Sequence, residues 1–120
     1  MAENKHYITR IQENGSVMIS EEVIATIVVH AIGEVDGVVS MGVKGDFVEL
    51  IEKKLWNKAL KITIGENDEL DIDCSVVLAY GQSVVATAKA VQEAVTGALE
   101  STTGVCVASV NVNVCGIVRQ

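Results

Sequence analysis

The stretch SVNVNVCGIV, Ser109 to Val118, alternates between branched apolar residues and small or polar ones. Successive side chains of a β-strand point to opposite faces, so this alternation predicts a strand with one buried and one solvated face. Val110, Val112 and Val114 are expected on the buried face. Asn111 and Asn113 are expected on the other, which forms either the wet side of a sheet or a partner-binding surface.

The same two-residue period recurs in Ala59 to Ile64 and in Leu70 to Tyr80. The polar residues GENDE join these runs, which predicts an antiparallel hairpin. The buried face of the longer run is expected to hold every second residue: Leu70, Ile72, Cys74, Val76, Leu78 and Tyr80. Two shorter strands are predicted near the N-terminus, with Asn14-Gly15 as the central pair of a type I′ turn.

Two segments carry the three- and four-residue spacing of amphipathic helices. The first follows Ser20, a predicted N-cap, and runs to about Ile32, with Gly33 expected in a left-handed C-cap. The second runs from Val84 to Ser101, capped by Ser83 and ended by Thr103-Gly104. Its expected apolar stripe consists of Val84, Ala88, Val91, Val95, Ala98 and Leu99.

The segment 42–57 has a different pattern and is treated as a variable insert. Asp46 and Glu49 resemble an acidic capping box, which predicts a short amphipathic helix after them. Phe47 and Trp56 are two of only four aromatic residues in the chain. They are expected either to pack as a lid or to contact a partner, and the tail 1–6 is expected to be frayed.

These elements predict one domain over residues 1–120. The chain has 120 residues, 49% of them hydrophobic, which is enough to form a core without disulfides or metal. The order of elements predicts an α+β two-layer sandwich, in which the two main helices pack on one face of a largely antiparallel or mixed sheet. No linker or low-complexity run divides the sequence.

Composition narrows the classes of partner. A net charge of −7, with no basic cluster, opposes binding to nucleic acid or to an anionic membrane surface. No run approaches the roughly 18 apolar residues of a spanning helix, and no signal peptide is recognisable. Three cysteines, Cys74, Cys106 and Cys115, without C-x-x-C spacing indicate core or strand residues in a reducing cytoplasm.

No catalytic constellation is evident. The carboxylates of ENDELDID do not have the spacing of an EF-hand, and Asp71 and Asp73 alternate with apolar residues as on a solvated strand face. His30 and His6 lie in no nucleophile or metal motif. Phosphate-binding glycine loops and a G-x-S-x-G elbow are absent. We therefore expect a non-enzyme without cofactors, and an enzyme using a divalent ion on the acidic hairpin is the weaker alternative.

Three blocks carry a family resemblance: GSVMISEEVIATIVVHAIGEVDGVVSM, LDIDCSVVLAYGQSVVATAKAVQEAV and TGVCVASVNVNVCGIV, in that order. Together they resemble the alkaline shock protein family, the Gls-type envelope stress response proteins of Gram-positive bacteria. The resemblance covers Gly15 to Val118, and Val43 to Leu60 is its least diagnostic part.

The resemblance implies a cytoplasmic, non-catalytic protein of cell-envelope homeostasis that self-associates as a dimer or larger and binds a membrane-anchored protein partner. The alternative is a small-molecule-binding or protein-binding regulator of fatty-acid or phospholipid metabolism, with an apolar ligand between the Phe47-to-Trp56 insert and the sheet. For self-association, the free edge of the valine-rich strand is a candidate, because unpaired backbone groups invite pairing with another strand.

Overall fold

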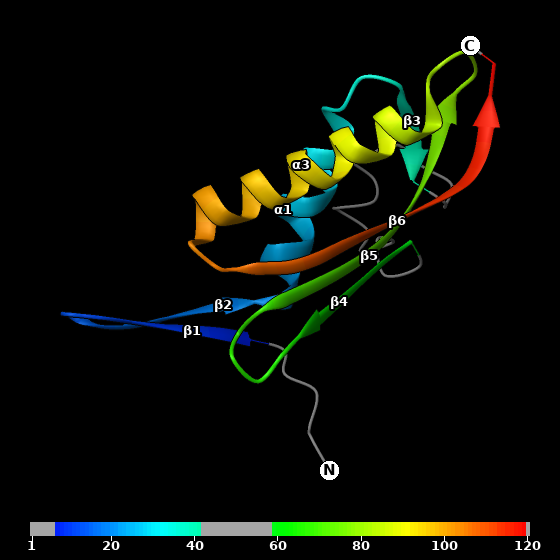
Figure 1. The fold of residues 1–120 in the computed structure, drawn as a ribbon. Coiled ribbons are helices and arrows are strands. Elements are labelled where there is room, and N and C mark those ends of the chain that lie inside the picture. The colour runs from blue at the N-terminus through cyan, green and yellow to red at the C-terminus, as the bar shows by residue number, and fades with distance from the viewer. Residues whose placement is uncertain (1–6, 42–58, 120) are drawn as a thin grey trace.

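The computed structural model describes residues 7–41 and 59–119, which form an α+β fold (Figure 1). Two helices lie on one side of a mixed sheet, as the sequence predicts, and a separate hairpin extends from this body. The tail 1–6 and the insert 42–57, with Phe47 and Trp56, lie outside the described residues. The helix predicted in the insert therefore stays a prediction.

The main sheet is built around β5 (Leu70–Ala79). On one edge, β5 pairs antiparallel with β4 (Leu60–Ile64) and, further along, with β3 (Val38–Met41). On its other edge β6 (Val107–Val118) runs parallel to it. A parallel neighbour requires a long crossover connection, and the helix between β5 and β6 provides it.

The β4–β5 hairpin forms as its alternating pattern predicts. Ile62 lies opposite Ile72, and Leu60 lies opposite Cys74, so each strand buries one face. In the turn, the Gly65 amide donates to the Glu69 carbonyl at 2.9 Å. Asp68 in this turn has a φ of 58°, a left-handed conformation that aspartate tolerates better than most residues.

Helices α1 (Glu21–Gly33) and α3 (Val84–Thr103) cover one face of the sheet (Figure 1). Their buried faces meet the buried face of β5, and all three contribute to a single core. The fully buried residues of this core include Ile24, Val28 and Ile32 of α1, Val91, Val95 and Leu99 of α3, and Leu70, Ile72, Val76 and Leu78 of β5.

Both predicted N-caps are confirmed, but only one predicted C-cap is. The hydroxyls of Ser20 and Ser83 each accept from an amide of the first helical turn at 3.3 Å. Gly104 ends α3 with a φ of 72°. The left-handed cap predicted at Gly33 is wrong, because Glu34 ends α1 with a φ of −89° and its amide donates to carbonyls of the last turn. No positive φ is needed at that end.

The hairpin of β1 (Tyr7–Gln12) and β2 (Gly15–Ser20) is a two-stranded sheet of its own, here called the arm (Figure 1). Gln12 lies opposite Gly15, so the loop is Glu13-Asn14. The predicted type I′ turn centred on Asn14-Gly15 is therefore wrong by one residue, and Asn14 has no positive φ. The buried side chain of Ile8 packs in the core and joins the arm to the body.

Two predicted apolar faces end before their sequence patterns do. Tyr80, expected on the buried face with Leu78, is 67% exposed, and Val84, expected in the stripe of α3, is also exposed. β5 ends at Ala79, and Gly81 then turns the chain with a φ of 96°. Tyr80 and Val84 therefore lie at the end of the sheet, where the helix and the strand no longer cover each other.

Candidate functional site

The outer face of the sheet, opposite the helices, carries polar side chains from β5 and β6. Parallel pairing places Asp71 opposite Ser109 and Asp73 opposite Asn111. The Ser109 hydroxyl donates to Asp71 Oδ1 at 2.7 Å, and Asn111 Nδ2 donates to Asp73 Oδ1 at 3.0 Å. Asn111 and Asn113 are exposed, as the alternation predicts, and form part of this polar sheet face.

The side chains of the polar sheet face are hydrogen-bonding and charged groups. Across residues 7–41 and 59–119, no group of three or more histidine, cysteine, aspartate or glutamate side chains could hold a metal ion. A shallow depression of about 390 Å³ lies between β4 and β6, with Lys61, Asp73 and Asn113 around it. Its amide, carboxylate and ammonium groups can exchange hydrogen bonds with another chain.

The cysteines divide into one buried and two exposed thiols, all of them free. Burial, with a smaller contribution from the charge of Asp73, raises the pKa of the Cys74 thiol from the usual 9 to about 11. Cys74 therefore stays a neutral core residue at physiological pH and is not a nucleophile. Cys106 and Cys115 are exposed, and Cys115 Sγ donates to the Val76 carbonyl at 3.4 Å.

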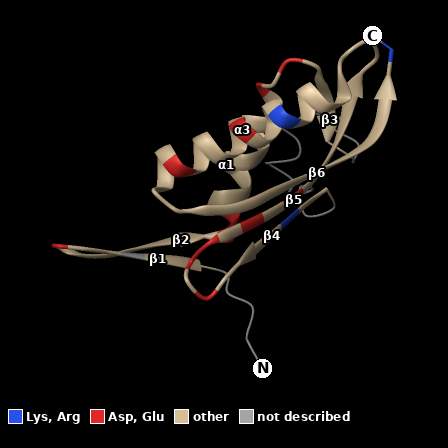
Figure 2. Cartoon of the chain, viewed as in Figure 1, with Lys and Arg blue, Asp and Glu red and all other residues tan. Residues whose placement is uncertain are grey.

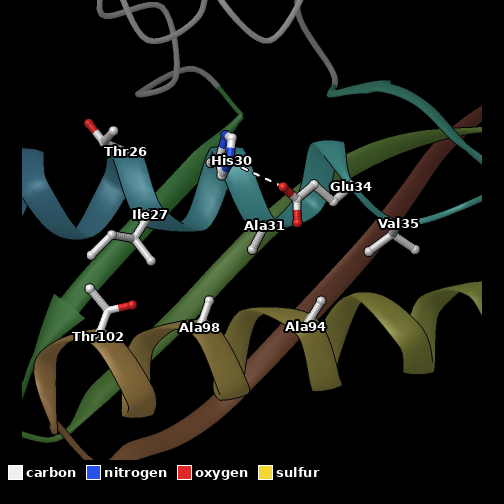
Figure 3. A pocket seen from close by; sticks show the side chains of 9 residues that line it. All are labelled: Thr26, Ile27, His30, Ala31, Glu34, Val35, Ala94, Ala98 and Thr102. Atoms are coloured by element: carbon white, nitrogen blue, oxygen red, sulfur yellow. Dashed lines mark ion pairs between the residues drawn. The ribbon is translucent and has the colours of Figure 1, made fainter.

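A groove lies between the two helices on the side away from the sheet (Figure 3). Its volume is about 540 Å³. It exists because α3 presents small side chains to α1, so that no large residue fills the space between the helix axes. The groove is lined by Thr26, Ile27, His30, Ala31, Glu34 and Val35 from α1 and the turn after it, and by Ala94, Ala98 and Thr102 from α3.

Few polar groups border this α1–α3 groove. His30 Nε2 lies 3.2 Å from Glu34 Oε1, and both side chains are largely exposed (Figure 3). Thr26 donates its hydroxyl to the Glu22 carbonyl at 2.9 Å, so it is already bonded within its helix. His30 is thus a flank residue of a packed helix, as predicted. An apolar groove of this size with a few polar groups has the make-up of a ligand or peptide site.

The structure tests only part of the predicted partner surface. Asn111 and Asn113 lie together on the polar sheet face, whereas Phe47 and Trp56 lie outside the described residues, so a partner role for those two stays a prediction. The α1–α3 groove was not anticipated from the sequence. The available signal was the four-residue spacing of Ala94, Ala98 and Thr102, which marks a helix face without large side chains.

Comparison with known families decides what kind of protein carries these surfaces. The model of the alkaline shock protein family, which is described as having a cell envelope-related function, matches residues 9–119. The chain belongs to the alkaline shock protein family. The resemblance seen in the sequence is thereby confirmed, and the match extends across the arm, both helices and the main sheet of this alkaline shock family protein.

Three relatives are similar over most of their lengths. The Bacillus subtilis protein YqhY is 34% identical over 107 residues, which cover 86% of this chain and 77% of YqhY. Spy1614 of Streptococcus pyogenes is 33% identical over 110 residues, 88% of this chain and 89% of the relative. YloU of Bacillus subtilis is 29% identical over 107 residues, 86% and 88% of the two chains. All three are described only as uncharacterized proteins.

The search of solved structures found no match to this alkaline shock family protein. Neither α1 nor α3, the two helices of its described part, is long and apolar enough to cross a membrane.

Proposed function

We propose that this alkaline shock family protein is a non-catalytic protein of the envelope stress response that maintains the cell envelope through self-association and contacts with protein partners. The family match over residues 9–119, with its cell envelope-related function, is the observation that carries the proposal. The exposed, hydrogen-bonding row of Asn111 and Asn113 supports a role in contact. Its amide groups can both donate hydrogen bonds to a partner and accept them.

The charge of the chain indicates how it would reach the envelope. A net charge of −7 repels an anionic lipid surface, which attracts clustered lysine and arginine. A membrane-anchored protein partner must then supply the contact with the bilayer, and the chain itself stays on the cytoplasmic side. The polar sheet face is the surface proposed for that partner.

A complementation experiment tests this proposal. The gene is deleted in its host, and growth under alkaline and cell-wall stress is measured after complementation with wild type, Asn113→Arg or Glu100→Gln. Both substitutions change the net charge by +1, but Glu100 lies on the exposed side of α3. Wild type and Glu100→Gln should restore growth, and Asn113→Arg should not. Normal growth of the deletion strain under both stresses would contradict the proposal.

The α1–α3 groove favours a second candidate function, a regulator of fatty-acid or phospholipid metabolism that binds an apolar small molecule. Ala98→Leu places a larger side chain in the groove, whereas Gly97→Ala adds a methyl group with no atom within 4 Å. Native mass spectrometry with long-chain fatty acids should show a complex with wild type and Gly97→Ala that Ala98→Leu loses. No complex with wild type would refute this candidate.

A further inference from the structure

The apolar lining of the α1–α3 groove continues onto the exposed surface of α1. Ile27 and Ala31 line the groove four residues apart, so they lie along one face of the helix. Val23 lies one turn before Ile27 on the same line and is 49% exposed. At the helical rise, the line from Val23 to Ala31 is about 12 Å long. Val35 extends it past the end of the helix, so the groove is part of a longer apolar surface.

Helix α3 presents only small side chains to this surface. Ala94 and Ala98 line the groove. Ala90, Gly97 and Ser101 lie on the same side of the helix, at three- and four-residue steps from them. The axes of packed helices lie about 8–10 Å apart, and small side chains permit the shorter distance. Another helix could therefore approach α3 closely along this side.

Gly97 is not explained by contacts of its own chain. It lies in the interior of α3, where glycine weakens a helix relative to alanine. It is exposed, and a Cβ added there would meet no atom within 4 Å among the described residues. Close approach of another backbone is a common reason for glycine at such a position. Gly97 leaves room for that approach from outside α3.

The charges around the groove are mostly negative (Figure 2). Among the residues of the two helices and the turn after α1, Lys89 is the only lysine or arginine, and it lies five residues before Ala94. His30, beside Glu34, adds a positive charge only when protonated. The carboxylates of these segments are Glu21, Glu22, Glu34, Asp36, Glu93 and Glu100. The surface therefore complements a positively charged occupant and repels a carboxylate or phosphate head group.

The groove is open to solvent between the two helices (Figure 3). His30 and Glu34 at its rim have side chains that are 73% and 72% exposed. Small-molecule sites commonly bury most of the ligand surface, whereas this groove leaves one side of an occupant in water. An amphipathic helix suits such a groove, because it has one apolar face to bury and one polar face to leave in water.

We infer that the α1–α3 groove binds a basic amphipathic helix of a partner protein. The apolar face of that helix lies on Val23 and Ile27 of α1 and passes over Gly97 of α3. Its lysine and arginine side chains lie near the carboxylates of the two helices. The charges favour this occupant over the fatty acid of the second candidate function. The contact uses the helical side of the molecule and does not depend on the polar sheet face, so it goes beyond the proposed function.

Fluorescence anisotropy of a labelled peptide tests the inference. The probe is a peptide of about 18 residues, or about five helical turns, with leucine at helical spacing on one face and lysine on the other. Wild type should bind it. Wild type should bind about tenfold more weakly to a peptide with glutamate in place of every lysine. The same loss is expected for a peptide of identical composition whose leucines lack helical spacing.

Two variants place the peptide on the groove. Ala98→Leu fills the groove, and Gly97→Lys puts a long cationic side chain where the partner helix approaches. Each should bind the lysine peptide about tenfold more weakly than wild type does. Ala108→Leu and Ala108→Lys are the matched controls, because they introduce the same side chains at an exposed position of β6, and they should bind as wild type does. Circular dichroism checks folding, and Gly97→Lys retains the test if Ala98→Leu unfolds.

Three outcomes would overturn the inference. Failure of wild type to bind the lysine peptide would show that the groove takes no such helix. Equal binding by Gly97→Lys and Ala108→Lys would place the peptide elsewhere on the acidic surface. A complex of wild type with palmitate, without peptide binding, would assign the groove to an apolar small molecule. None of these outcomes alters the stress phenotype of Asn113→Arg, so failure of this contact and failure of the envelope role are distinguishable.

Discussion

Removing the buried thiol of Cys74 should change how the stability of the protein depends on pH. Cys74 is 2% exposed on the core face of β5, and burial raises its pKa to about 11. In the unfolded chain the thiol loses its proton near pH 9. Between these values the unfolded state releases a proton that the folded state retains, so alkaline conditions favour unfolding.

The size of the effect follows from the two pKa values. A shift of about two units corresponds to about 3 kcal/mol of stability, which is fully present below pH 9 and lost as the pH rises to 11. Cys74→Ala removes this dependence but also removes a packed sulfur atom, which costs about 1 kcal/mol. The variant should therefore be less stable than wild type at pH 8 and more stable above about pH 10.

Urea unfolding followed by circular dichroism, at intervals from about pH 8 to about pH 10.5, measures this difference. All other ionisable groups are common to both proteins, so their contributions cancel in the comparison. Cys106→Ala is the matched control, because it removes an exposed thiol by the same substitution. A constant difference between wild type and Cys74→Ala over the whole range would refute the reasoning.

Further predictions concern helix α3 and the exposed thiols. Leu99→Ala should lower the free energy of unfolding by about 3–5 kcal/mol, since Leu99 is fully buried, and a loss below about 1 kcal/mol in urea titrations would contradict its place in the core. Ser83→Ala should cost about 1 kcal/mol through loss of the N-cap, while Ser101→Ala, on the same helix, should change stability by less than about 0.5 kcal/mol. Equal losses for the two serine variants would argue against the cap. Ellman's reagent should label Cys106 and Cys115 in the folded protein and the third thiol only after unfolding, so three rapidly labelled thiols would contradict the described burial.

The two-residue period was the most reliable guide to the sheet. It placed Asn111 and Asn113 on the solvated face and Ile72 and Cys74 on the buried face, because the alternation of side chains holds whichever strands are neighbours. Strand order was not predictable in this way. The parallel pairing of β6 with β5 depends on the crossover through α3, which local patterns do not encode.

The arm shows why a strong turn signal can fail. A turn centred on Asn14-Gly15 would shift every cross-strand partner by two residues, so that Ile8 would lie opposite Glu21 instead of Ile19. The observed register pairs Ile8 with Ile19, and Ile8 is fully buried while Ile19 packs against the core. The observed register places these two isoleucines directly opposite each other, and this cross-strand apolar pair outweighs the preference of one dipeptide.

The exposed apolar surfaces were the least predictable features. The apolar pattern of α3 begins at Val84, but the point at which the helix stops covering the sheet depends on the assembled fold. Val84 lies beyond that point and is exposed. Likewise, Ile11 and Met18 read as ordinary strand residues until the hairpin is seen to extend from the body. Sequence periodicity indicates which face of an element is apolar, and only the packing shows whether that face is covered.

In-cell crosslinking of a tagged copy, followed by mass spectrometry of the bound proteins, tests the envelope role most directly. Wild type and Glu100→Gln should recover the same integral membrane protein, which Asn113→Arg should recover poorly. Recovery of lipid-synthesis enzymes by all three proteins, with no membrane protein, would contradict the envelope role and favour the metabolic regulator.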